Sequence, residues 1–207
     1  MKIFVVVSCI IFLGVALYAD TIWGRYLVGV KNHPEYAEGI GTSPIIALSY
    51  VFLGIYYNLT IWYKLTNKTI YGAYITLAGA VITLVLNYIS IPYFGYWGSA
   101  FATLICYGFM MLVSYKQGQK HYPIPYAGKK LTAYVLLSVF VYLLYFGIRI
   151  PIKNTIIGLS VATTLFILFI WFIGIAEKKE ISRLPFVGRF YKLSPVAGGA
   201  VVEDLKV

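Results

Sequence analysis

Six long runs of apolar residues, none of which contains an acidic or basic side chain, constrain what this chain can fold into. They cover residues 3–19, 44–63, 70–91, 97–115, 131–148 and 155–176. An α-helix needs roughly 17–25 residues to cross the hydrocarbon core of a bilayer, and each run is of that length. Transmembrane strands would instead alternate apolar and polar residues over about 10 positions. The pattern predicts an all-α polytopic membrane protein with six transmembrane helices.

The first run has a second interpretation, as a secretory signal peptide. Lys2 supplies a positive start, and Ala19 ends a tolerable cleavage site. The apolar stretch is longer than the 7–15 residues typical of a signal peptide. Its length therefore favours a transmembrane helix.

Composition supports a membrane rather than a soluble fold. Of 207 residues, 60% are apolar and 12% are charged, whereas soluble domains carry about 25% charged residues. The net charge of +10 would suggest nucleic acid in a soluble chain, but here it suits the anionic surface of a membrane. We therefore expect membrane lipid, and no nucleic acid, as a partner. Cys9 and Cys106 both lie in apolar runs and are interpreted as small hydrophobic residues.

The basic residues between the runs predict the orientation. With six spans, thirteen of the seventeen Lys and Arg residues fall on the side of the termini and four on the other. The positive-inside rule then places both termini in the cytoplasm. The organisation expected is a four-helix segment over 1–116, a basic cytoplasmic linker over 117–130, a helix pair over 131–176 and a basic tail over 177–207. The loop at 92–96 is expected to be a hairpin in which Pro92 stops one helix and Gly95 eases the turn.

No catalytic or cofactor-binding pattern is present, so we predict neither an enzyme nor a bound cofactor. His33 and His121 fall in loops on opposite sides of the membrane in this topology, and neither a P-loop nor a metal-binding motif occurs. The runs also contain no carboxylate of the kind that proton and sodium relays use.

Polar residues inside or beside the runs are the candidate functional positions. Asn58 follows Gly54 by four residues, and Asn87 ends a row of the same spacing that begins at Gly79; a further row of small residues begins at Gly98. Small residues four apart let helices approach closely, and the two amides are expected to face a cavity rather than lipid. Tyr57, like its neighbour Tyr56, needs a hydrogen-bond partner inside the bundle. Lys64 and Arg149 lie at run ends, where a cation either snorkels to the interface or meets a ligand phosphate.

Residues 44–126 resemble the C-terminal half of bacterial Wzx-like oligosaccharide flippases, members of the multidrug/oligosaccharidyl-lipid/polysaccharide (MOP) exporter superfamily, whose fold is MATE-like. The resemblance lies in FLGIYYNLTIWYKLTNKT at 52–69, IPYFGYWGSAFAT at 91–103 and KHYPIPY at 120–126. It implies that the chain corresponds to the last six of about fourteen helices, and so to a fragment of a larger transporter or to a product that needs a partner chain.

The resemblance also implies a function and a location. It implies translocation of undecaprenyl-pyrophosphate-linked oligosaccharide across the bacterial inner membrane for surface polysaccharide synthesis, with lipid-linked oligosaccharide and glycan-assembly proteins as partners. The positions expected to line the path, without any catalytic role, are Asn58, Tyr57, Lys64, Asn87 and Arg149. Two alternatives remain: a drug or small-solute exporter of the same superfamily, and a membrane scaffold subunit that transports nothing.

Overall fold

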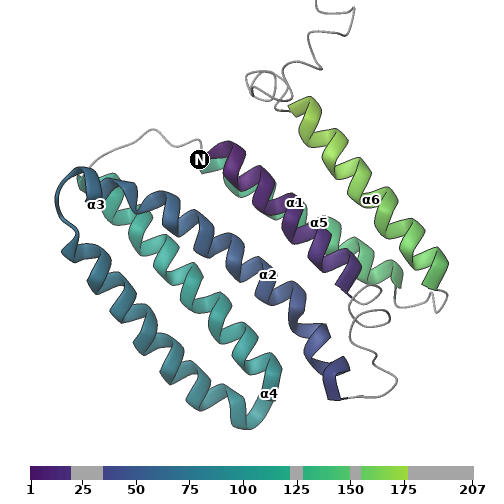
Figure 1. Ribbon diagram of the computed structural model, residues 1–207, viewed down its shortest axis with the longest axis horizontal. Helices are drawn as coiled ribbons and strands as arrows, with labels where there is room; N and C mark the ends of the chain where they lie inside the picture. The colour runs from purple at the N-terminus through teal and green to yellow at the C-terminus, as the bar shows by residue number, and fades with distance from the viewer. Residues whose placement is uncertain (20–34, 122–127, 150–154, 177–207) are drawn as a thin grey trace, which may run out of the picture. The chain divides into compact units, whose positions relative to one another are not determined.

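The computed structural model describes residues 1–19, 35–121, 128–149 and 155–176, and these are helical with no strand among them. Six helices follow one another along the chain (Figure 1): α1 (Lys2–Tyr18), α2 (Glu35–Leu59), α3 (Ile61–Leu65), α4 (Ile70–His121), α5 (Gly128–Arg149) and α6 (Thr155–Ala176). The expected tail at 177–207 and most of the stretch between the first two apolar runs, residues 20–43, lie outside the described residues. The all-α class that the sequence predicts is confirmed for this part of the chain.

Helix α4 is a hairpin of two arms that reverses at Gly95. Gly95 has φ 52° and ψ −127°, a conformation open to glycine because it has no Cβ. The first arm covers residues 70–94 and the second covers 96–121, and Figure 1 shows them running back beside each other. The predicted hairpin is therefore confirmed at Gly95. Pro92 does not stop the first arm as expected: it lies inside the helix, because proline keeps a helical φ and removes only its own N–H bond, so the helix continues through it to Gly95.

Two helices extend further than the sequence suggests. Helix α2 begins at Glu35 and carries Pro44 in its interior, although the apolar run begins only at Pro44. Helix α4 continues to His121, and α5 begins at Gly128. The predicted linker over 117–130 is thus helical at both ends, and residues 122–127 lie outside the described part. Basic and polar residues at these ends are compatible with a helix, so the loss of apolar character did not mark the helix boundary.

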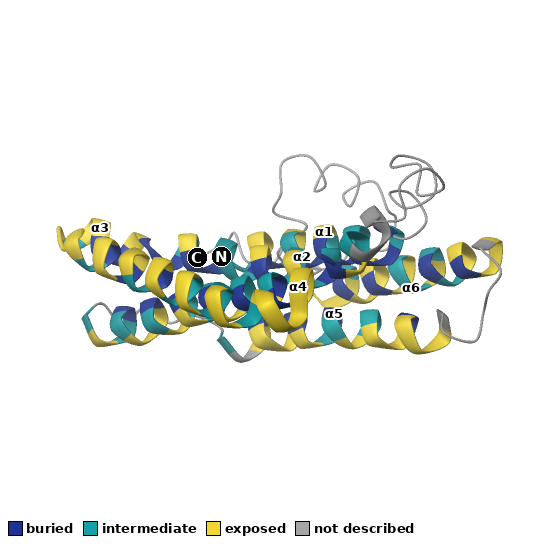
Figure 2. Ribbon diagram, turned by 90° about the horizontal axis from the view of Figure 1, so that it is seen from below, coloured by how far each residue is buried: buried dark blue, intermediate teal, exposed yellow. Residues whose placement is uncertain are grey.

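Four helices of the described part are long and apolar enough to cross a membrane. They are the helical stretches 39–65, 70–121, 130–148 and 156–176, and α1 is a shorter apolar helix. The outer surface of α4 is strongly apolar, with Leu84 at 71% and Tyr88 at 85% exposure (Figure 2). Such a surface belongs in lipid or against other helices. These features are those of a multi-pass membrane protein.

Glycines allow the arms of α4 to pack closely against each other. A Cβ on Gly79 would lie 2.6 Å from Met110 Sδ, and Cys106 Sγ donates a hydrogen bond to the Gly79 carbonyl at 3.2 Å. A Cβ on Gly98 would lie 2.7 Å from the Ser90 carbonyl oxygen. The close approach predicted from the rows of small residues is therefore confirmed.

The helices form two compact units, residues 1–166 and 167–207. In the first unit, α2 packs against α1 and against α4, and α1 packs against α5. The first turns of α6 join this unit through Tyr18, whose hydroxyl donates to Thr163 Oγ1 at 3.0 Å and whose ring meets Phe166 edge-on. The described part of the second unit is the end of α6, residues 167–176.

Candidate functional site

One face of α2 is exposed at several positions and continues onto α3. Five residues mark it, and we call them the α2 stripe: Ser43, Ala47, Tyr50, Tyr57 and Lys64. At 100° per residue they fall within an arc of about 100°. Thr60, between α2 and α3, keeps helical angles of φ −63° and ψ −14°, so the helical path continues from α2 into α3. The Phe4 ring of α1 covers the stripe at Gly54, where a Cβ would lie 2.8 Å from it. Tyr50 is 59% and Tyr57 63% exposed.

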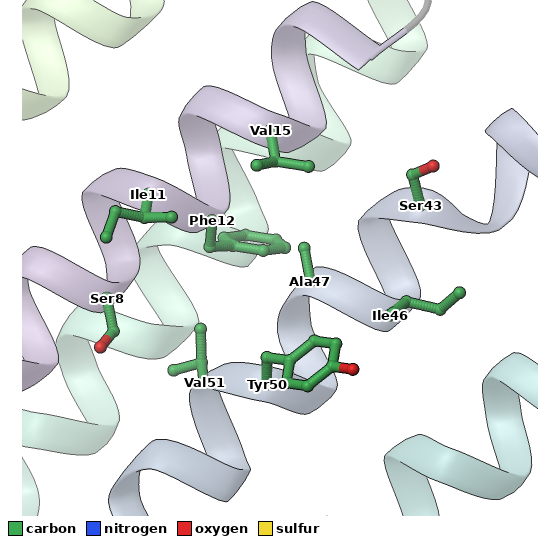
Figure 3. A pocket seen from close by; sticks show the side chains of 9 residues that line it. All are labelled: Ser8, Ile11, Phe12, Val15, Ser43, Ile46, Ala47, Tyr50 and Val51. Carbon is green, nitrogen blue, oxygen red and sulfur yellow. The ribbon is translucent and has the colours of Figure 1, made fainter. Parts of the chain in front are cut away.

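The first half of the α2 stripe forms the wall of a groove between α1 and α2. Figure 3 shows the groove, of about 550 Å³, with Phe12 reaching from α1 toward Ala47. The lining side chains are mostly apolar: Ser8, Ile11, Phe12 and Val15 from α1, and Ser43, Ile46, Ala47, Tyr50 and Val51 from α2. Volumes of about 300–1,000 Å³ are typical of sites that bury small ligands. Its polar groups are two serine hydroxyls and the Tyr50 phenol, so it suits a hydrocarbon.

Lys64 is the last residue of the α2 stripe and follows two buried aromatic residues. The lysine is exposed, whereas its neighbours Trp62 and Tyr63 are 1% and 7% exposed. Tyr63 packs so closely over the first arm of α4 that a Cβ on Gly72 would lie 2.8 Å from its ring. No acidic residue occurs between Glu38 and Glu177. Lys64 therefore presents an ammonium group that no carboxylate of this segment neutralises.

Two aromatic rings from α3 and the start of α4 meet a third ring from the far end of α4. The Trp62 ring stacks on His121 with centroids 5.4 Å apart and planes 14° apart, and Tyr71 contacts both rings. Gly118, one turn before His121, makes room: a Cβ there would lie 3.0 Å from Trp62 Cδ1. The expectation that His121 lies in a loop is wrong, because it is the last residue of α4. The spacing of Gly118 and His121, three apart on one helix face, is the signal that sequence reasoning missed.

Three buried polar atoms near this aromatic cluster have no hydrogen-bond partner within the described part of the chain. They are Trp62 Nε1, Ser114 Oγ and Gln117 Oε1. Trp62 Nε1 lies 3.3 Å from the Cβ position of Gly118, and Ser114 is one turn earlier on the same arm. An unsatisfied buried polar group costs about 1–3 kcal/mol. The contact between α3 and the second arm of α4 is thus less favourable than the apolar contact between Gly79 and Met110, which joins the two arms of α4.

The five positions predicted to line a path do not converge on one point. Tyr57 and Lys64 both lie on the α2 stripe, and Asn58 lies at its edge. Asn58 is half-buried and donates from Nδ2 to the Gly54 carbonyl of its own helix at 3.1 Å. Asn87 lies on the first arm of α4, about 25 Å of helix beyond Ile70. Arg149 is the last residue of α5, and its side chain lies outside the described part.

The hydrogen-bond expectations for these residues have mixed outcomes. Tyr56 does find a partner in the bundle, since its hydroxyl lies 3.4 Å from Thr76 Oγ1 on α4. The same expectation is wrong for Tyr57, which lies exposed beside the Tyr56 ring with centroids 5.6 Å apart. Asn87 is half-buried, and its Oδ1 has no partner among the described residues. An unsatisfied amide oxygen of this kind leaves Asn87 available to a ligand or a neighbouring helix.

Within the described residues, no group of three or more His, Cys, Asp or Glu side chains lies close enough to hold a metal ion. Cys9 and Cys106 are both buried as free thiols. The chemistry available at the α2 stripe is therefore binding: hydrophobic contact in the groove, aromatic faces and phenols in the middle, and a cation at the end. Comparison of the chain with protein-family models, with curated proteins and with solved structures finds no significant match.

Proposed function

We propose that this chain is the C-terminal part of a flippase that moves undecaprenyl-pyrophosphate-linked oligosaccharide across a bacterial inner membrane for surface polysaccharide synthesis. The proposal includes six membrane spans with both termini in the cytoplasm. Four of them are α2, α5, α6 and α1, and the two arms of α4 supply the others. The chain has no catalytic role in this proposal, because it changes the position of the substrate and not its bonds.

The α2 stripe is the observation that carries the proposal. From Ser43 to Lys64 the stripe follows about 31 Å of helix, which is close to the ~30 Å thickness of the hydrocarbon core. The stripe is exposed at Tyr50, Tyr57 and Lys64 and is covered by Phe4 of α1 at Gly54, so it offers an amphiphilic ligand contacts at several depths of the bilayer. A packing surface buried inside the bundle would offer none.

Each part of the stripe matches one part of the proposed substrate. The groove between α1 and α2 suits the polyprenyl chain, because its lining is almost entirely apolar. Tyr50 and Tyr57 offer exposed rings and phenols to sugar units. Lys64 offers a charge to the pyrophosphate, since an ammonium binds phosphate as a point charge. The orientation proposed from the basic residues places Lys64 at the cytoplasmic surface, where such a lipid is made.

The exposed face of α4 suits the proposal that this chain works with further helices. Leu84 and Tyr88, one turn apart on the first arm, are each more than two-thirds exposed. The Asn87 Oδ1, which has no hydrogen-bond partner among the described residues, lies on the same arm. The first lobe of a flippase, or a glycan-assembly protein, is the partner proposed for this face. Asn87 and Arg149 would then line the far end of the path.

Binding of the lipid carrier by the purified chain tests the proposal. The probe is undecaprenyl pyrophosphate, titrated against the chain in detergent and measured by native mass spectrometry. We expect Lys64→Gln to weaken binding by about fivefold, the effect of removing one cation near the membrane surface. Lys68→Gln is the matched control, because Lys68 is also exposed but lies off the stripe.

A tyrosine pair gives an independent arm of the same experiment. Tyr57 and Tyr74 are 63% and 62% exposed, and only Tyr57 lies on the stripe. We expect Tyr57→Ala to weaken binding of the oligosaccharide-loaded carrier, with Tyr74→Ala unchanged. Equal effects within each pair would contradict the proposed path. Binding of cationic drugs in place of the carrier would favour the small-solute exporter.

A further inference from the structure

A second groove lies among three helices on the other side of α2 from the first. It has a volume of about 550 Å³ and lies between α2, the second arm of α4 and the start of α5, with Met1 also in its lining, and we call it the α5 groove. Its lining includes Phe52 and Ile55 from α2, Met111 and Leu112 from α4, and Leu131 and Val135 from α5. The α2 stripe contributes no residue to it, so this groove is separate from the proposed path.

The mouth of the α5 groove is positively charged. Lys116 follows Leu112 by four residues and therefore lies on the same face of α4, where it is exposed. Lys130 and Lys120 are exposed at the same end of the bundle. Because no acidic residue occurs between Glu38 and Glu177, these cations have no carboxylate of their own segment beside them.

Backbone polarity adds to this charge. Helix α5 begins at Gly128, which lines the groove, and a helix N-terminus carries a partial positive charge from its free N–H groups. The Tyr115 hydroxyl lies near the same point, since a Cβ on Gly128 would be 3.7 Å from it. The groove thus has an apolar interior and a mouth that combines a lysine, a phenol and a helix N-terminus.

We infer that the α5 groove binds one anionic phospholipid of the surrounding bilayer, with an acyl chain in the groove and the headgroup phosphate beside Lys116 and the start of α5. The apolar lining accounts for the acyl chain, and the charge of the mouth selects an anionic headgroup over a zwitterionic one. Basic pockets between transmembrane helices bind anionic headgroups in this way. The bound lipid fills the space between α5 on one side and α2 and α4 on the other, and so contacts all three helices.

The charge of the mouth is tested with two lipids that differ only in their headgroup. The full chain, purified in detergent, is titrated with phosphatidylglycerol and with phosphatidylcholine of the same acyl chains, and retained lipid is counted by native mass spectrometry. We expect one phosphatidylglycerol per chain, bound at least about fivefold more tightly than phosphatidylcholine. Lys116→Gln should lower the phosphatidylglycerol affinity by about fivefold, and Lys68→Gln should not.

The apolar interior is tested with a matched tryptophan pair. Leu112 lines the groove and is 55% exposed, whereas Ile105 lies two turns away on the same face and is 53% exposed. We expect Leu112→Trp to lower retention of both lipids because the indole fills the groove, with Ile105→Trp unchanged. Soluble glycerol phosphate, which lacks acyl chains, should not compete.

Several results would overturn the inference. They are equal affinity for the two lipids, equal effects within either matched pair, competition by glycerol phosphate, and dimers of the chain in place of lipid adducts. None of these results bears on undecaprenyl pyrophosphate binding at Lys64, so the two proposals fail separately.

Discussion

Substitution of Gly98 by alanine should separate the two arms of the α4 hairpin. A Cβ at this position would lie 2.7 Å from the carbonyl oxygen, 2.8 Å from the carbonyl carbon and 2.9 Å from the Cβ of Ser90. Two of these atoms are backbone, so no side-chain rotation relieves the contact. The arms must move apart by about 0.7 Å to restore the ordinary contact distance of 3.4 Å.

The expected cost follows from two opposing terms. Overpacking of a close contact costs about 1–3 kcal/mol, while alanine in a helix is about 0.8–1.0 kcal/mol more favourable than glycine. Gly98→Ala should therefore change the free energy of unfolding by between about zero and a loss of about 2 kcal/mol. Gly147→Ala provides the reference, because nothing lies within 4 Å of its Cβ position, and it should stabilise by about 0.8–1.0 kcal/mol.

The assay is unfolding of the purified chain in mixed micelles with increasing dodecyl sulfate, followed by tryptophan fluorescence. The quantity compared is the difference between the two variants, in which the helix-propensity terms cancel. We expect Gly98→Ala to be about 1–3 kcal/mol less stable than Gly147→Ala. Equal stability would refute the close approach of the two backbones at the Gly95 turn.

Two further predictions concern stability and topology. Ser114→Ala should leave the free energy of unfolding unchanged or raise it by about 1–3 kcal/mol, because the Ser114 hydroxyl is buried without a partner among the described residues. Ser138→Ala should lower the free energy of unfolding by about 1 kcal/mol, because Ser138 Oγ donates to the Val135 carbonyl at 2.8 Å. Thermal unfolding in detergent measures both serine variants, and an equal loss of stability in the two would contradict these assignments. In intact cells, a membrane-impermeant thiol reagent should label Tyr93→Cys but not Lys68→Cys, with low background because Cys9 and Cys106 are buried. The reverse labelling would contradict the orientation inferred from the basic residues.

The helical class and the hairpin could be predicted because local features specify them. The apolar runs leave the backbone no alternative to helices in a membrane, and Gly95 supplies the one conformation that reverses α4. The rows of small residues likewise marked Gly79 and Gly98 as contact points. Helix ends were harder to predict, since Pro44 and Pro92 lie within helices instead of ending them.

The exposed side of each helix could not be predicted, and this limited the prediction of the site. A helix that is apolar all round has no polar face, so periodicity does not indicate which side packs. Tyr56 and Tyr57 are neighbours of the same type, yet one is buried at 4% and the other exposed at 63%. The stacking of Trp62 on His121 joins residues far apart in the sequence. Such a contact depends on how α2, α3 and α4 assemble, which no single run encodes.

The most direct measurement of the central claim is the leaflet distribution of lipid-linked oligosaccharide in cells depleted of this chain. If the chain is part of the flippase, depletion should cause the loaded carrier to accumulate on the cytoplasmic leaflet while surface polysaccharide falls, and Lys64→Gln should restore less export than Lys68→Gln. Unchanged distribution of the carrier with normal surface polysaccharide would contradict the claim.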